Sequence, residues 1–250
     1  MINRPVILFV PTVILLWFSS YAGAALRRRR PLAPDSRDDF GVVQAAALTL
    51  LALIIGFTFS MATTRYDLRK SYEEAEANAI GTEYVRAGLL PQAEATRVQN
   101  MLLTYTDLRI AFYRTRDGQE LQQINTDTAN LQDQLWAAVK APALSQPTPV
   151  TALAVSGMND VLNSQGYTQA AWWNRIPVAA WAFLILTAIG CNLLVGYGSR
   201  SNQAISGLLF VMPVLVGISF LLIADIDSPR GGLIHVSPQN LAALWQSLHK

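Results

Sequence analysis

The chain has 250 residues, 19 of them basic and 17 acidic, and this near balance of charge argues against nucleic-acid binding. The charges are unevenly spread, because residues 5–26, 40–64, 176–199 and 201–224 contain none. Each of these stretches reaches the roughly 20 residues that an apolar helix needs to cross the ~30 Å hydrocarbon layer of a bilayer. The sequence therefore predicts a multi-pass membrane protein and argues against a water-soluble enzyme.

The first uncharged stretch resembles a signal peptide, because the small residues 22–24 could form a cleavage site. However, only Arg4 precedes the stretch, whereas the four arginines at 27–30 follow it, which is the reverse of the usual order. We therefore expect a membrane helix, kinked at Pro11. Short connections follow the first and third stretches, so the spans form two antiparallel hairpins.

Between the hairpins, charged residues are frequent and predict a soluble helical domain. The second membrane helix has no proline after Arg65 until Pro91, so we expect it to continue to about Leu89. Further helices are expected at 93–115, 119–140 and 150–173, with the proline-containing segment 142–149 breaking the chain. The expected fold is all-α, with four transmembrane helices. Its expected parts are the first hairpin (1–64), the soluble domain (65–175), the second hairpin (176–224) and a C-terminal tail (225–250).

Three local features complete the fold prediction. The tail should contain a short helix with Ser237 as its N-cap and Pro238 as its first residue. Asn192, inside the third span, is expected to form a hydrogen bond between helices. Lysine and arginine are equally numerous near the two membrane faces, if Arg4 and Arg200 are included, so charge alone does not give the orientation.

The sequence contains little that indicates catalysis or a bound cofactor. Its one cysteine, Cys191, excludes an intrachain disulfide, and His235 and His249 lack the spaced partners of a zinc site. Phosphate-binding glycine loops and nucleophile motifs are also missing from the sequence. We expect neither an enzyme nor a protein with a metal or other cofactor.

Three segments carry a resemblance to a known family. They read EANAIGT at 76–82, YVRAGLLP at 84–91 and IADIDSPRG at 223–231. Through these segments, nearly the whole chain resembles the bacterial bestrophin-like family. That family is defined by a domain of unknown function, which is named for its similarity to bestrophin anion channels. The resemblance implies a multi-pass protein of the bacterial inner membrane, with the soluble domain and both termini in the cytoplasm. The acidic calcium clasp of animal bestrophins has no counterpart after Gly232.

Bestrophins are pentamers whose pore is narrowed by apolar residues one turn apart on the second membrane helix. The pair Gly56-Phe57, followed by Arg65-Tyr66, resembles the bestrophin pattern just past that constriction. This register implies that Phe57 and Leu53 line the pore neck, with Thr49 one turn above. The neighbouring stripe Leu51, Ile55 and Phe59 has the same four-residue spacing and is an alternative.

Charged residues near the membrane have two interpretations each. Arg69, Glu73 and Glu76 lie three or four residues apart, so they predict either a surface ladder of ion pairs or a charged ring lining a vestibule. Asp225 and Asp227, where the fourth span ends, either pair locally or belong to an ion path.

Two functions from different classes remain open. One is an oligomeric, anion-conducting channel in the lipid bilayer, a homopentamer by the resemblance. The other is a non-conducting membrane subunit that holds a partner complex through the helical domain.

Overall fold

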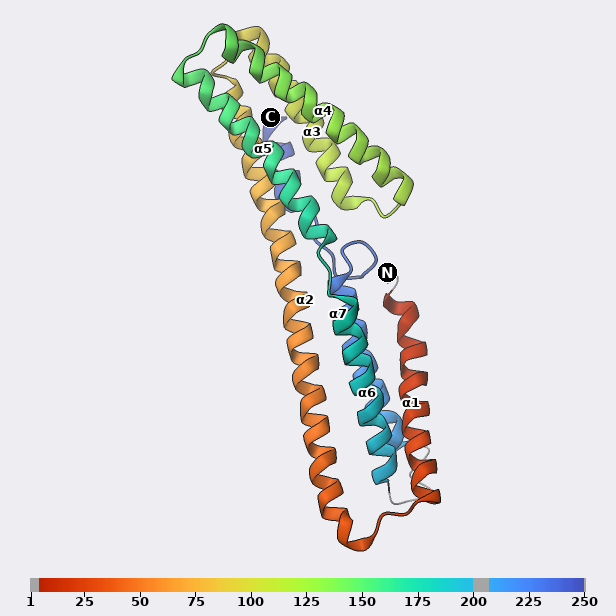
Figure 1. Cartoon of the computed structure of the whole chain (residues 1–250). Helices are drawn as coiled ribbons and strands as arrows, with labels where there is room; N and C mark the ends of the chain where they lie inside the picture. Colours follow the sequence, from red (N-terminus) through yellow and green to blue (C-terminus); the bar gives the residue numbers. More distant parts are fainter. Residues whose placement is uncertain (1–4, 200–206, 250) are drawn as a thin grey trace. The chain divides into compact units, whose positions relative to one another are not determined.

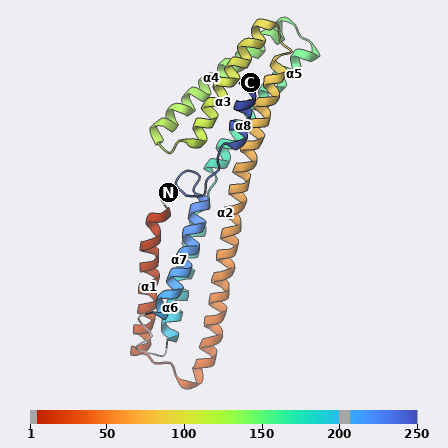
Figure 2. The same cartoon turned by 180° about the vertical axis from the view of Figure 1, so that it is seen from behind.

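The computed structural model describes residues 5–199 and 207–249, and within these ranges the chain forms helices and no strand (Figures 1 and 2). Arg4, Arg200 and the first residues of the predicted fourth span lie outside the described residues. The elements are α1 (Pro5–Arg29), η1 (Pro34–Ser36), α2 (Arg37–Ala87), α3 (Gln92–Arg114), α4 (Gly118–Ser145), α5 (Pro149–Trp173), α6 (Val178–Gly198), α7 (Leu208–Asp227) and α8 (Gln239–Leu248).

The chain divides into two compact units. The membrane unit comprises Met1–Arg65 and Arg175–His235, and the helical unit comprises Tyr66–Asn174 and Val236–Lys250. In the described chain, four helical segments are long and apolar enough to cross a membrane. The all-α membrane fold predicted from the sequence is therefore confirmed.

In the membrane unit, α1 packs along α6 and α7, and these two helices lie between α1 and the membrane part of α2 (Figures 1 and 2). A Cβ atom at Gly196 would overlap the carbonyl oxygen of Ser20, and one at Gly23 would overlap that of Leu193. Glycine at these positions lets the two backbones touch, as is common between membrane helices. The Ser20 Oγ donates a 3.3 Å hydrogen bond to Asn192 Oδ1, which confirms the interhelical bond predicted for Asn192.

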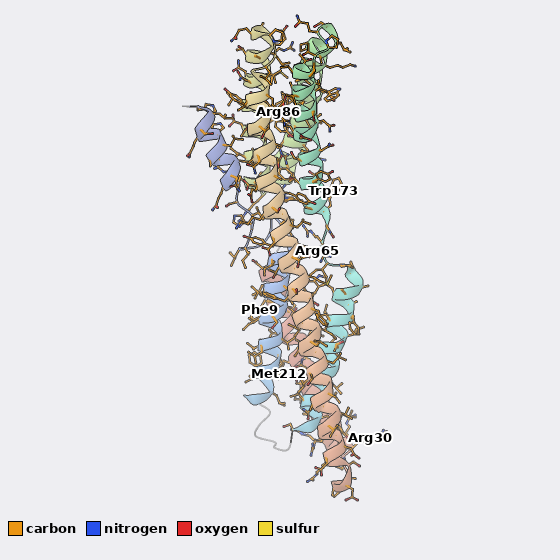
Figure 3. All side chains as sticks on the ribbon, turned by 90° about the vertical axis from the view of Figure 1, so that its left-hand side faces the viewer. Phe9, Arg30, Arg65, Arg86, Trp173 and Met212 are labelled. Carbon is orange, nitrogen blue, oxygen red and sulfur yellow. The ribbon has the colours of Figure 1, made fainter. Side chains whose placement is uncertain are left out.

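The long helix α2 covers 51 residues without interruption, and this confirms the predicted continuation through Arg65. Of the most apolar 18-residue stretch of α2, only 6% is buried within the chain, compared with 50% for the corresponding stretch of α7. Figure 3 shows the membrane part of α2 in front, with α6 and α7 behind it. This helix therefore leaves most of its membrane surface for lipid, water or other protein chains.

In the helical unit, α3, α4, α5, α8 and the last part of α2 enclose one apolar core. Fully buried residues of this core come from several helices: Ile80, Val98, Leu102, Tyr105, Leu135, Val139, Met158 and Leu241. Asp117 begins α4 by accepting hydrogen bonds from the backbone N–H groups of Gln119 and Glu120. A capping box between Thr148 and Thr151 begins α5.

Two expected helix ends differ from the structure. The helix α4 does not stop near Lys140 but continues to Ser145 with Pro142 inside it. Pro142 is in the last turn and its ring is buried, so the helix loses one backbone hydrogen bond while gaining apolar contact. The N-cap of α8 is Pro238 rather than Ser237, and it has no side-chain cap of its own.

Candidate functional site

The three residues predicted to form a neck lie on an uncovered face of α2. Leu53 and Phe57 have exposed fractions of 52% and 63%, and Thr49 is exposed as well. Because they are four residues apart, they follow one side of the helix. The Thr49 hydroxyl donates a 2.9 Å hydrogen bond to the carbonyl oxygen of Ala45. Its polar group is therefore satisfied within the helix, which reduces the cost of a threonine in this apolar stripe.

The alternative stripe is less suited to face a pore. Leu51 is only 2% exposed, because it packs with Leu16 and Leu184 in the core of the membrane unit. Ile55 also packs against that core, whereas Phe59 is 40% exposed. The first residue of the alternative stripe is thus buried within the subunit. This favours Thr49, Leu53 and Phe57 as the residues available to line a pore.

The charges predicted for a surface or vestibule are buried instead. Arg69 and Glu73 are each 1% exposed and Glu76 is 0% exposed, so the expectation of solvent-facing charges does not match the structure. The reason is that this side of α2 forms part of the core of the helical unit. The three- and four-residue spacing correctly places these residues on one face, but it does not reveal that other helices cover it.

Glu76 lies at the centre of a buried polar network. Its Oε1 accepts a hydrogen bond from Arg109 Nε, and its Oε2 accepts bonds of 3.1 Å from Thr168 Oγ1 and 3.3 Å from the Tyr113 hydroxyl. Burial by itself would lower the pKa of the Arg109 guanidinium, but the Glu76 carboxylate together with Tyr105 and Tyr113 outweighs burial and raises the pKa. The Arg109 guanidinium also lies 4.4 Å from the ring centre of Phe112. The network joins α2, α3 and α5, so its role is to hold the helical unit together.

Glu73 has a different structural role. Its Oε1 accepts a 2.9 Å hydrogen bond from the backbone N–H of Leu241, and its Oε2 accepts a 2.6 Å bond from Asn240 Nδ2. A carboxylate near the first N–H groups of a helix satisfies donors that have no partner in the helix itself. Glu73 thus supplies the cap that the sequence assigned to Ser237, and it does so from 168 residues away.

The side of α2 opposite to Glu73 and Glu76 carries exposed polar residues that the sequence did not single out. Asp67, Ser71, Glu74 and Asn78 are all exposed, on the part of α2 that follows the membrane segment. A signal was present in the sequence, because these residues continue the face of Leu53 and Phe57 in steps of seven.

The two acids at the end of α7 have local partners. The Asp225 carboxylate accepts hydrogen bonds from the backbone N–H groups of Leu233, at 2.9 Å, and Ile234, at 2.8 Å. The Asp227 carboxylate accepts from the N–H of Ile176, at 3.1 Å. Both side chains are nearly buried, so these bonds offset part of the cost of removing the charges from water. In the described parts of the chain, no group of three or more His, Cys, Asp or Glu residues is placed to hold a metal ion.

Comparison with known proteins agrees with this architecture. The fold is similar to that of a bacterial bestrophin homologue from Klebsiella pneumoniae, with a TM-score of 0.63, 14% sequence identity, and 96% of this chain and 95% of that chain covered. A point mutant of that homologue gives a TM-score of 0.65 at 12% identity, with 96% of each chain covered. No curated protein matches the sequence significantly.

These likenesses define an all-α membrane protein with the bestrophin fold. The family model for the bestrophin-like domain matches residues 6–241, so the chain belongs to the bestrophin-like family.

Proposed function

We propose that this chain is one subunit of a homo-oligomeric ion channel, whose neck is formed by Phe57, Leu53 and Thr49 of α2. The fold and the family point to a channel rather than an enzyme. The observation that carries the proposal is the uncovered membrane part of α2, where only 6% of the most apolar 18-residue stretch is buried. Copies of the chain arranged around an axis would bring this face of each α2 together.

A neck of this kind would act through its size and its lack of polar groups. Rings of Leu53 and Phe57 side chains around a narrow pore oppose the entry of water, and without water a hydrated ion cannot pass. Smaller side chains should therefore increase conductance. By the same resemblance, the channel lies in the bacterial inner membrane with the helical unit in the cytoplasm. A cysteine introduced near Asp117 should then be protected from an impermeant reagent in intact cells. Labelling at that position would show that the proposed orientation is wrong.

The test compares two pairs of substitutions in the full-length protein. Phe57→Ala with Leu53→Ala should raise KCl efflux from reconstituted liposomes. The control pair, Phe183→Ala with Leu186→Ala, removes side chains of the same types from α6, where they are 55% and 67% exposed. The control should leave efflux unchanged, because lipid-facing residues affect stability and not the pore. Unchanged efflux for the α2 pair, in correctly assembled protein, would refute the proposal.

The alternative function is a non-conducting subunit that holds a partner complex. Mass measurement of the detergent-solubilised protein distinguishes the two functions, because a channel must be a closed oligomer of this chain. A single copy in a larger assembly would favour the accessory role. The resemblance to bestrophins favours anions as the permeant ions.

A further inference from the structure

In the membrane unit, α6 begins and α7 ends at the same end of the helix bundle (Figures 1 and 2). A cavity of about 220 Å³ lies between these two helix ends. Val178, Trp181 and Ala224 contribute to its apolar wall, and Arg175 and Asp227 contribute charged groups. Pockets that enclose a whole small molecule have volumes of about 300–1,000 Å³. This cavity can therefore hold only part of a larger ligand, and the rest of that ligand extends out of it.

The cavity is at the depth of the lipid headgroups. Arg175 is the last charged residue before the uncharged stretch 176–199, and Asp225 is the first one after the stretch 201–224. Both stretches cross the hydrocarbon layer, so the residues at their ends lie near the headgroups. Trp181, whose ring packs edge-on against Phe220 at 6.3 Å between ring centres, is of the residue type that anchors spans at this depth. Phospholipids are therefore the molecules that surround the cavity.

Arg175 and Asp227 give the cavity one charge of each sign. In the described chain, the Arg175 guanidinium has no acidic side chain within 4 Å and no hydrogen-bond acceptor. A guanidinium can bind two phosphate oxygens through parallel N–H groups. The Asp227 carboxylate accepts hydrogen bonds of 3.1 and 3.2 Å from the backbone N–H of Ile176. A carboxylate has about four acceptor positions, so this N–H does not exhaust its capacity.

We propose that the cavity binds one phosphatidylethanolamine molecule, with the lipid phosphate on Arg175, the ammonium group toward Asp227 and the start of one acyl chain against the apolar wall. The charges favour this headgroup, because a zwitterion supplies one charge of each sign. An anionic lipid would instead bring its phosphate close to the Asp227 carboxylate without a cation between them. The rest of the lipid remains in the bilayer, in agreement with the small volume. The site requires that the chain lies in a membrane, and not that it conducts ions.

The test is native mass spectrometry of the full-length protein in detergent, titrated with phosphatidylethanolamine. Arg175→Gln should raise the dissociation constant of this lipid about tenfold, because it removes charge-assisted hydrogen bonds to the phosphate. Ala224→Leu fills the cavity without changing its charge and should also weaken binding several-fold. Arg29→Gln is the matched control, since it removes an exposed arginine at the other end of the membrane unit, and it should leave the dissociation constant unchanged.

Two further titrations on the original protein need no substitution, so they stand even if a variant does not fold. Phosphatidylglycerol should bind more weakly than phosphatidylethanolamine, and equal binding would overturn the proposed headgroup. Glycerophosphoethanolamine, which has the same headgroup without acyl chains, should not displace the lipid. Displacement would show that the site takes a soluble phosphate ester.

The variants separate the two parts of the site. Unchanged lipid binding by folded Arg175→Gln protein would overturn the phosphate contact. Unchanged binding by folded Ala224→Leu protein would show that the lipid lies on the surface and not in the cavity.

Discussion

Glu83 offers a test of how a buried carboxyl group makes the stability of the helical unit depend on pH. It lies on α2, is 0% exposed and packs against Gly157 of α5, where an added Cβ atom would overlap its Oε2. Neither carboxylate oxygen has a hydrogen-bond partner in the described chain. Burial raises the pKa of Glu83 from 4.5 to about 8, with nearby Arg86 opposing the rise and Asp160 adding to it.

The sign and size of the effect follow from this pKa. The folded state binds the Glu83 proton more tightly than the unfolded state, so the contribution of Glu83 to stability is greatest below pH 4.5 and falls until about pH 8. One pKa unit corresponds to about 1.4 kcal/mol, which gives a loss on the order of 3 kcal/mol by neutral pH. For a chain of this size, that loss lowers Tm by roughly 6–12 °C.

Glu83→Gln removes the charge while keeping most of the shape. We expect the variant to match the original protein near pH 5 and to be more stable at pH 8, when unfolding in detergent is followed by circular dichroism. Glu74→Gln is the matched control, because Glu74 is exposed on the same helix and its substitution should give no such pH-dependent difference. A Glu83→Gln effect that is the same at every pH would refute the reasoning.

Two further predictions concern packing. Gly196→Ala should prevent α1 from packing on α6 and lower the yield of folded protein, whereas Gly190→Ala, in open space on the same helix, should not; equal yields would contradict the close contact. Glu73→Gln should weaken the cap on α8 and increase hydrogen exchange at the Leu241 amide by about fivefold or more, since a hydrogen bond to a charged group contributes about 1.5–3 kcal/mol. Unchanged exchange at Leu241 would show that Glu73 does not hold α8.

The sequence predicted most of the helices because they depend on local patterns. Uncharged length defined the membrane spans, and the lack of proline after Arg65 predicted the long α2. The environment of α2 beyond the membrane was not predictable in the same way. Periodicity shows that Glu73 and Glu76 share a face, but only the fold shows that α3, α5 and α8 provide partners for that face. The cap on α8 is likewise a contact between residues far apart in the chain.

The pairing of α1 with α6 and α7 has a consequence for biosynthesis. About 150 residues separate the end of α1 from the start of α6, which at 5–20 residues per second means roughly 7–30 s of translation. During that time Gly23 has no helix to pack against, and Arg27 lacks the Tyr197 carbonyl oxygen to which it donates a 2.8 Å hydrogen bond in the finished fold. A ribosome that stalls before α6 therefore leaves a membrane unit in which α1 lacks both of its packing partners, α6 and α7.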